Sequence, residues 1–170
     1  MRRDELPDHI PTLVELFQEC GTEYDLSLDL KDDRAGPVVL ETVSEHAPDL
    51  LPRLWLCDPS WERLVALRER SAEVRLVDST RLSRIKEGAE RRLATLAEHR
   101  IDALNMHHSD WNGGLVSLAH RFGRFAFGWD LQQDRVLHTG LRMGLDAVFS
   151  DYVDRMRSAF DVQIGAGPPA

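Results

Sequence analysis

Residues 24–31 read Tyr24-Asp25-Leu26-Ser27-Leu28-Asp29-Leu30-Lys31, a strict alternation of apolar and polar side chains. A period of two predicts a β-strand with one apolar face and one polar face. A helical pattern follows, which favours a parallel sheet, and parallel strands are usually apolar on both faces. A polar face on this strand is therefore unusual and indicates a possible functional role. Asp29 and Lys31 stand at the carboxyl end of this strand, where parallel α/β folds place their chemistry.

The strand-then-helix pattern recurs along the chain. Short apolar segments that predict strands begin near residues 25, 53, 74, 103, 125 and 145, and helical periodicity follows each one. A further helix, with Pro11 in its first turn, precedes the first strand. No interior segment rich in Gly, Pro or Ser separates domains. The sequence therefore predicts one domain over residues 1–162 and a disordered tail over residues 163–170.

Repeated βα units fit either a closed (β/α)8 barrel or an open doubly wound sheet. No Gly-x-Gly-x-x-Gly and no phosphate-binding loop follows a strand, which weakens the nucleotide-binding versions of the open sheet. The polar face of residues 24–31 favours the mouth of a barrel. A TIM barrel has eight strands and about 250 residues, whereas these 170 residues supply six strands. We therefore expect an α/β fold of the TIM (β/α)8 type, incomplete, with about six βα units.

Composition excludes several classes of function. The formal net charge is −8 and the arginines are scattered over helical segments, so the chain is not expected to bind nucleic acid. No apolar run approaches the ~20 residues of a membrane helix. The first residues lack the apolar core of a signal peptide, which predicts a cytoplasmic protein. Cys20 and Cys57 are interpreted as spectator thiols rather than a disulfide or a nucleophile.

Residues 107–110 read His-His-Ser-Asp and have the composition of a metal site. Adjacent residues of a strand face opposite ways, so His107 and His108 are not expected to bind one ion. Only His107 shares the face of Asn105. A polar loop after a strand is the favoured interpretation, and His107 stays a candidate substrate contact. In the same way, Asn112 before a pair of glycines is interpreted as a plain helix cap.

Several segments, in their order and spacing, resemble the C-terminal part of the glycerophosphodiester phosphodiesterase family. They are the Pro-Thr-Leu helix start at 11–13, the acidic strand at 28–31, the Ala-Leu-Asn-Met-His-His segment at 103–108, the Phe-Gly-Trp-Asp segment at 127–130, and the closing Gly-x-Asp-x-x-x-Ser-Asp segment at 144–151. The resemblance covers roughly residues 8–160. It implies a TIM barrel that hydrolyses glycerophosphodiesters to an alcohol and glycerol 3-phosphate with a divalent metal, Ca²⁺ or Mg²⁺.

The resemblance also implies roles for individual residues. Asp29 matches a metal carboxylate of the family, where Glu is usual, so its reach is shorter by one methylene. Lys31 matches a lysine that balances phosphate charge. Trp129 matches a tryptophan beside the substrate, and Asp130 replaces the threonine that often follows it. Without the resemblance, an inward salt bridge between Asp29 and Lys31 that closes a polar barrel layer is the favoured interpretation.

The family's opening His-Arg-Gly strand, its Glu-x-Asp metal pair and its His-Asp segment have no counterpart in these residues. The catalytic residues are therefore unknown, and the acid and base histidines are expected in an N-terminal segment outside this sequence. Three hypotheses follow: a glycerophosphodiester hydrolase given in part, a truncated non-catalytic barrel remnant, or an unrelated open-sheet α/β binding module. A remnant would expose strand edges at 25–31 and 145–149 and would self-associate.

Overall fold

The computed structural model of the chain describes residue 7 and residues 9–165. Six strands form one parallel sheet, and each strand pairs with its neighbours in chain order. The strands are β1 (Leu26–Asp29), β2 (Leu54–Asp58), β3 (Arg75–Thr80), β4 (Ala103–His107), β5 (Phe125–Trp129) and β6 (Ala147–Val148). A doubly wound sheet reverses its strand order at a switch point. The unbroken order seen here is that of a barrel wall, and the open-sheet alternative does not hold.

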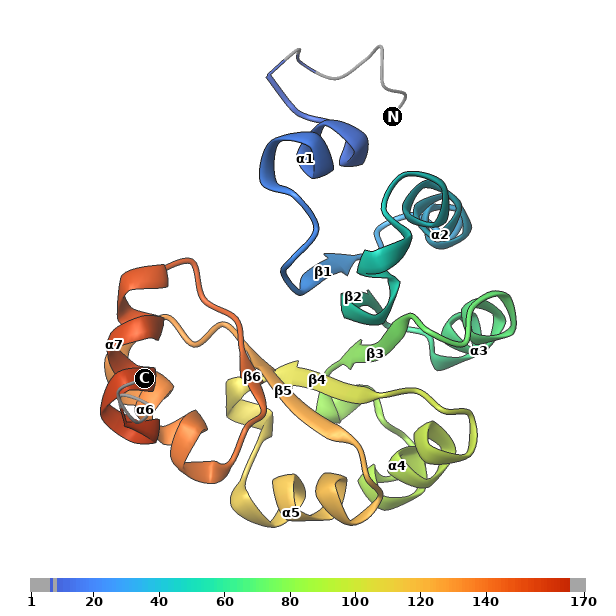
Figure 1. Cartoon of the computed structure of the whole chain (residues 1–170). Helices are drawn as coiled ribbons and strands as arrows, with labels where there is room; N and C mark the ends of the chain where they lie inside the picture. The colour runs from blue at the N-terminus through green and yellow to red at the C-terminus, as the bar shows by residue number, and fades with distance from the viewer. Residues whose placement is uncertain (1–6, 8, 166–170) are drawn as a thin grey trace.

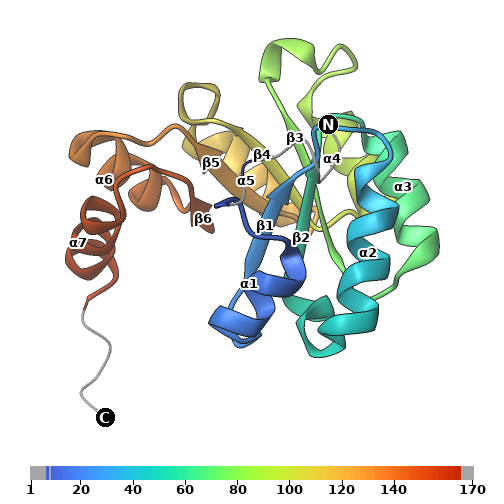
Figure 2. The same cartoon turned by 90° about the horizontal axis from the view of Figure 1, so that it is seen from above.

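The sheet curls into a half-barrel whose helices lie on the convex side (Figure 1). The α-helices are α1 (Leu13–Cys20), α2 (Ala35–His46), α3 (Trp61–Arg70), α4 (Ala89–Glu98), α5 (Gly113–Arg121), α6 (Asp134–Met143) and α7 (Val153–Ile164). The short 3-10 helices of the described residues are η2 (Pro48–Arg53), η3 (Leu82–Arg84) and η4 (His108–Asp110). The view from above shows α6 packed beside α7 at one end of the wall (Figure 2). The expected incomplete TIM barrel is confirmed.

Local side-chain chemistry sets the helix starts. Thr12 forms a capping box with Glu15, so α1 begins after Pro11 and not at it. Ser60 caps α3 by accepting a hydrogen bond from the Arg63 amide. Asn112 caps α5 in the same way, with 3.0 Å between its Oδ1 and the Leu115 amide nitrogen, as expected for a plain cap. The capping signals in the sequence therefore place these helices.

Helix α7 reaches the start of the expected disordered tail. Residues 163 and 164 belong to α7, while residues 166–170 lie outside the described part of the chain. No helix among the described residues combines the length and the apolar character that crossing a membrane requires.

The two faces of the sheet bury different side chains. A leucine-rich core fills the space between the sheet and the helices, and it includes Leu54, Leu56, Leu76 and Leu104, all fully buried. The predicted alternation in β1 is confirmed, since Leu26 and Leu28 pack against this core while Ser27 and Asp29 are exposed. Because the wall is open, the polar face of β1 meets solvent.

A smaller apolar layer lines the concave face. It is built from Cys57, Val77, Ala103 and Phe127, with Trp55, Ala147 and Phe149 packed against it. A cavity of about 390 Å³ lies on this face between β1 and β6, and Trp55, Phe125 and Phe149 are among its walls. In the described chain, β1 and β6 each pair on one side only. Their free edges flank this aromatic hollow.

Ion pairs to Asp102, one of them largely buried, join the amino ends of β3 and β4. Asp102 accepts hydrogen bonds from Arg68 at 2.8 Å, from Arg75 at 3.1 Å and from the Leu76 amide at 2.8 Å. Arg68 is buried and also donates to three backbone carbonyls. In TIM barrels this end of the strands serves stability, whereas the carboxyl end serves function. The charged residues at the carboxyl ends are therefore the ones to consider for chemistry.

Candidate functional site

The site residues predicted from the sequence all stand at the carboxyl rim of the half-barrel. Asp29 ends β1 and Lys31 follows it, while His107 ends β4 and Trp129 ends β5. His107 and Trp129 are register partners, and their rings make a T-shaped contact with a centroid distance of 4.7 Å. The fold thus forms two groups on one rim, the first on β1 and the second across β4 and β5.

Asp29 and Lys31 form a direct ion pair at the rim. Both side chains are exposed, Asp29 at 53% and Lys31 at 81% of full accessibility, because the polar face of β1 borders the open side of the wall. An exposed pair of this kind contributes little stability, about 0–1 kcal/mol. Lys31 can therefore leave Asp29 for an anionic ligand at little cost in free energy.

The expected metal site at Asp29 is not complete in the described residues. Calcium takes six to eight oxygen ligands and magnesium six, from several carboxylates, carbonyls and waters. Asp29 supplies one carboxylate, which Lys31 already neutralises. No group of three His, Cys, Asp or Glu ligands in the described chain includes Asp29. The residues present here do not fit a Ca²⁺ or Mg²⁺ site of their own.

His107 is held in one orientation by partners on both ring nitrogens. Its Nδ1 accepts the Ser109 amide hydrogen at 3.2 Å and lies 2.7 Å from Ser109 Oγ. Since Nδ1 is an acceptor, the proton of the neutral ring resides on Nε2. Nε2 donates to Asp130 Oδ2 at 3.0 Å. His107 is therefore an oriented imidazole rather than a freely rotating side chain.

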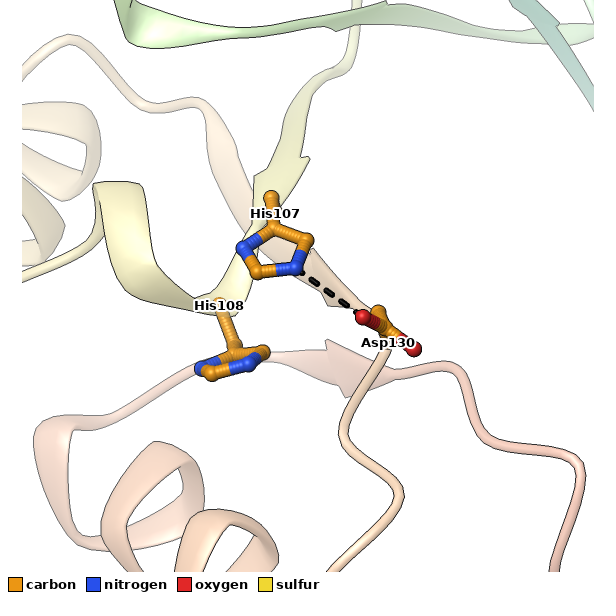
Figure 3. A group of neighbouring side chains, drawn as sticks. All are labelled: His107, His108 and Asp130. Carbon is orange, nitrogen blue, oxygen red and sulfur yellow. Dashed lines mark hydrogen bonds and ion pairs between the residues drawn. The ribbon is translucent and has the colours of Figure 1, made fainter.

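His108 lies beside His107, contrary to the expectation from strand alternation. Strand β4 ends at His107 and η4 begins at His108, so the two residues do not share an extended backbone. Their ring centroids are 4.3 Å apart, and the ligand atoms of His107, His108 and Asp130 all lie within 4.8 Å of one another (Figure 3). The argument that the two histidines cannot face one ion fails, because the period of two stops at the strand end.

Local interactions tune the charges of this trio. Burial lowers the pKa of His108, and the neighbouring His107 lowers it further, which favours a neutral imidazole. The hydrogen bond from His107 lowers the pKa of Asp130, and Gln132 adds to the effect, so Asp130 is an anion. Asp130 adopts φ +64°, a left-handed conformation that Asp tolerates better than most residues. The chain thus turns sharply after β5 and presents this carboxylate to His107.

Arg81 is a rim cation that the sequence did not single out. It follows β3, donates from Nε to Asp110 Oδ2 at 2.6 Å, and lies 5.6 Å from the centre of the Trp129 ring. Burial opposes the effect, but the hydrogen bonds from Arg81 and the Leu82 amide lower the pKa of Asp110. The sequence signal that could have identified Arg81 was its position directly after a predicted strand. The partners of Arg81 come from two other βα units, and residue spacing does not reveal such contacts.

Asn105 lies on the concave face of β4, two residues before His107. It is 5% exposed, and its amide donates to Ser79 Oγ at 3.2 Å. Its Oδ1 is buried and has no hydrogen-bond partner in the described chain. Buried polar atoms are normally satisfied, so this acceptor without a partner marks a polar point on the concave face of β4.

Two other tryptophans are packing residues, and the two cysteines are unpaired. Trp111 is buried and donates to the Phe127 carbonyl at 2.8 Å, and Trp61 stacks on His99. Cys20 and Cys57 are free thiols. Burial raises the pKa of Cys57 to about 11, which makes it a poor nucleophile.

No protein-family model and no curated protein sequence matches this chain. Solved structures do. A protein from Silicibacter pomeroyi DSS-3, described as a glycerophosphoryl diester phosphodiesterase, is 22% identical over 91% of this chain and 57% of its own, with a TM-score of 0.76. A phosphodiesterase from Oleispira antarctica, in complex with the product sn-glycerol-3-phosphate, is 25% identical over 89% and 61%, with a TM-score of 0.72. A protein from Galdieria sulphuraria, described as a glycerophosphodiester phosphodiesterase, is 16% identical over 87% of this chain and 63% of its own, with a TM-score of 0.73.

These likenesses bear on the fold. The chain has a partial glycerophosphodiester phosphodiesterase-like fold, an incomplete TIM barrel of six βα units. It spans between 57% and 63% of the length of these three structures.

Proposed function

We propose that this chain is the substrate-holding wall of a phosphoric diester hydrolase of the glycerophosphodiester type. The observation that carries the proposal is the match of its half-barrel to phosphodiesterases, one of them holding sn-glycerol-3-phosphate. In this proposal the ligand is a small glycerophosphodiester, cleaved to an alcohol and glycerol 3-phosphate. The predicted cytoplasmic location and the absence of nucleic-acid binding stay predictions.

Two cations and one aromatic ring of the rim support a phosphate-ester ligand. Lys31 is an exposed ammonium that neutralises phosphate as a point charge. Arg81 adds a guanidinium against Trp129, whose ring offers an apolar face to the glycerol carbons. Their role in the reaction would be to position the diester and to stabilise negative charge that develops at phosphorus.

Two further polar groups suit the glycerol part of the ligand. The buried, unpartnered Oδ1 of Asn105 would accept a hydrogen bond from a glycerol hydroxyl once a movement of its side chain exposes it. His107 stands on the same strand face, and its Nε2–H, which donates to Asp130 in this structure, would turn to contact a substrate oxygen. Substrate contact is the role assigned here to His107.

Hydrolysis itself needs groups that these residues do not supply. The resemblance implies acid and base histidines and a set of carboxylates around a hard divalent metal. Asp29 would contribute one ligand to such a set, and it does not complete the set alone. We therefore assign binding and orientation of the diester to this chain, and no proton-transfer step to its residues.

Titration of the purified chain with sn-glycerol 3-phosphate, followed by calorimetry, tests the proposal. Replacing Lys31 by Ala removes a hydrogen-bonded charge partner, worth about 1.5–3 kcal/mol, so affinity should fall about 10- to 100-fold. Lys86→Ala is the matched control, because Lys86 is the other lysine of the chain and donates to the Ser83 carbonyl. Absence of binding, or an equal loss in both variants, would support the alternative of a non-catalytic remnant.

A turnover assay separates binding from hydrolysis. With glycerophosphocholine as substrate, and Ca²⁺ or Mg²⁺ present, we expect this chain to release no glycerol 3-phosphate. Metal-dependent release that Asp29→Asn abolishes would instead show that these residues suffice for the chemistry.

Self-association through the free strand edges is a second, independent proposal about the state in solution. Edge strands offer unpaired backbone groups to other chains, and β1 and β6 each leave one edge unpaired in the described chain. We expect a concentration-dependent dimer in sedimentation velocity. A monomer at all concentrations up to about 100 μM would contradict it.

A further inference from the structure

Three side chains with metal-binding atoms converge on the rim between β4 and β5. They are His107, His108 and Asp130, and their ligand atoms lie within 4.8 Å of one another (Figure 3). In the described chain this is the group of three that could hold an ion, and it does not include Asp29. The trio belongs to a part of the rim that the metal site expected at β1 does not use.

We propose that His107, His108 and Asp130 form a binding site for a divalent cation of the zinc class. Two imidazole nitrogens and one carboxylate oxygen are a donor set suited to Zn²⁺ and its transition-metal neighbours, with three protein ligands and an open position. Ca²⁺ and Mg²⁺ bind oxygen and disfavour such a set. The site therefore differs from the hard-metal site expected at Asp29 in both position and chemistry.

The geometry requires a modest adjustment to close on an ion. Zinc–nitrogen bonds of about 2.0 Å in a tetrahedral site place ligand atoms roughly 3.3 Å apart. Nε2 of His107 and Oδ2 of Asp130 already lie 3.0 Å apart. Separations of up to 4.8 Å within the trio then call for side-chain movement of at most about 1.5 Å. Because His108 lies in a one-turn 3-10 helix after the strand, its side chain can supply that movement.

The surroundings already orient one of the ligands. Ser109 contacts Nδ1 of His107 through both its amide and its Oγ, which directs Nε2 toward Asp130. When Nε2 binds an ion, the ring proton resides on Nδ1, which then donates to Ser109 Oγ at 2.7 Å, and the Ser109 amide gives up its hydrogen bond to Nδ1. A hydrogen bond from the far nitrogen of a metal-binding histidine is the usual supporting interaction in protein metal sites.

Room for a further ligand exists beside the trio. His108 lines a small cavity of about 130 Å³, together with Arg135, Thr139 and Met143. Three protein ligands leave at least one coordination position for water or an anion. The positive charge of Arg135 on this cavity favours an anion at that position.

Metal titration of the chain, with no phosphate present, tests the proposal. The protein would carry Cys20→Ser, because an exposed thiol binds zinc on its own. After treatment with a chelator, calorimetry with Zn²⁺ should show one ion per chain, and Co²⁺ should produce visible absorption bands of a site with nitrogen ligands. Asp130→Asn and His107→Ala should each weaken zinc binding by more than about 100-fold, since changes in merely supporting residues already cost 10- to 100-fold.

The control is His120→Ala. His120 also pairs with a carboxylate, 2.8 Å from Asp146, but at the amino end of β5, and the described chain offers no third ligand there. The zinc affinity of the His120→Ala variant should equal that of the parent protein. Urea unfolding of each variant without metal separates loss of the site from loss of the fold.

Two results would overturn the proposal. One is absence of zinc binding to the folded parent protein. The other is binding that Asp130→Asn and His107→Ala leave unchanged. Because no phosphate ligand takes part, neither result affects the binding of glycerol 3-phosphate proposed above.

Discussion

Asp78 is a buried carboxyl group whose ionisation should control the pH dependence of stability. It lies in β3, faces α4 and is fully buried. Its Oδ2 accepts a hydrogen bond from Arg92 at 2.9 Å, while its Oδ1 has no partner in the described chain. Arg92 also binds Glu87 at 2.6 Å, so its charge is shared. Burial therefore outweighs the ion pair and raises the pKa of Asp78 to about 6.

The sign and size of the effect follow from linkage. The folded state holds the Asp78 proton more tightly than the unfolded chain, whose pKa is near 3.8. The stability that this group contributes is therefore present below pH 3.8 and is lost as the pH rises to about 6. A pKa increase from 3.8 to about 6 corresponds to about 3 kcal/mol. This is a large part of the stability of a typical domain, about 5–15 kcal/mol.

The substitution Asp78→Asn removes the titrating carboxyl group and keeps the shape of the side chain. Between pH 4 and pH 7 the free energy of unfolding of the variant, relative to the parent protein, should rise by about 2.4 kcal/mol, since part of the effect already lies below pH 4. Urea unfolding at several pH values, followed by circular dichroism and tryptophan fluorescence, measures this difference. Asp32→Asn is the control, because hydrogen bonds from Arg34 lower the pKa of the exposed Asp32, so it titrates below this range.

The pH profile distinguishes the two physical accounts of Asp78. If the ion pair with Arg92 dominates, the pKa of Asp78 is lowered instead. Asp78→Asn would then show a constant deficit between pH 5 and pH 7, which shrinks only in strong acid. That profile would refute the argument from burial.

Other predictions concern packing and thiol reactivity. A methyl group added in Gly128→Ala would lie 2.7 Å from a leucine methyl carbon, so the free energy of unfolding should fall by about 1–3 kcal/mol. In Gly113→Ala no atom lies within 4 Å of the new carbon, so the free energy of unfolding measured with urea should not fall. Leu104→Ala empties a fully buried position of the sheet and should cost about 2–5 kcal/mol in the same assay, and a loss under 1 kcal/mol would contradict the close packing. A thiol reagent at pH 8 should label exposed Cys20 far faster than Cys57, whose pKa burial raises to about 11, and equal rates in mass spectrometry would be inconsistent with that burial.

The sequence predicted the wall of the barrel because the wall depends on local periodicity. The alternation at residues 24–31 and the capping residues Ser60 and Asn112 each act within a few residues. Strand β6 is the exception. It was expected over residues 145–149 and comprises Ala147–Val148, because Leu145 instead packs over Gly128 and Gly140. That contact joins β5, α6 and the chain before β6, and no local pattern encodes it.

The site was less predictable because its contacts cross strands. His107 meets Asp130 only through the register that pairs His107 with Trp129. His108 joins them because β4 ends at His107 and the chain turns directly into η4. Arg81 reaches Asp110 across 29 residues. The sequence identified most of these side chains as polar residues after strands, and the curvature of the sheet determined which of them meet.

The two free edges of the sheet have a consequence for how a ring could close. A closed barrel of this type has eight strands, and six are present. One added strand would hydrogen-bond to a single edge, β1 or β6, and would leave a gap. A second strand would bond on both of its sides at once, to the first and to the opposite edge, while covering Trp55, Phe125 and Phe149. Closure by two added strands would therefore be cooperative: the second strand would bind more strongly than the first, and partly closed rings would be sparsely populated.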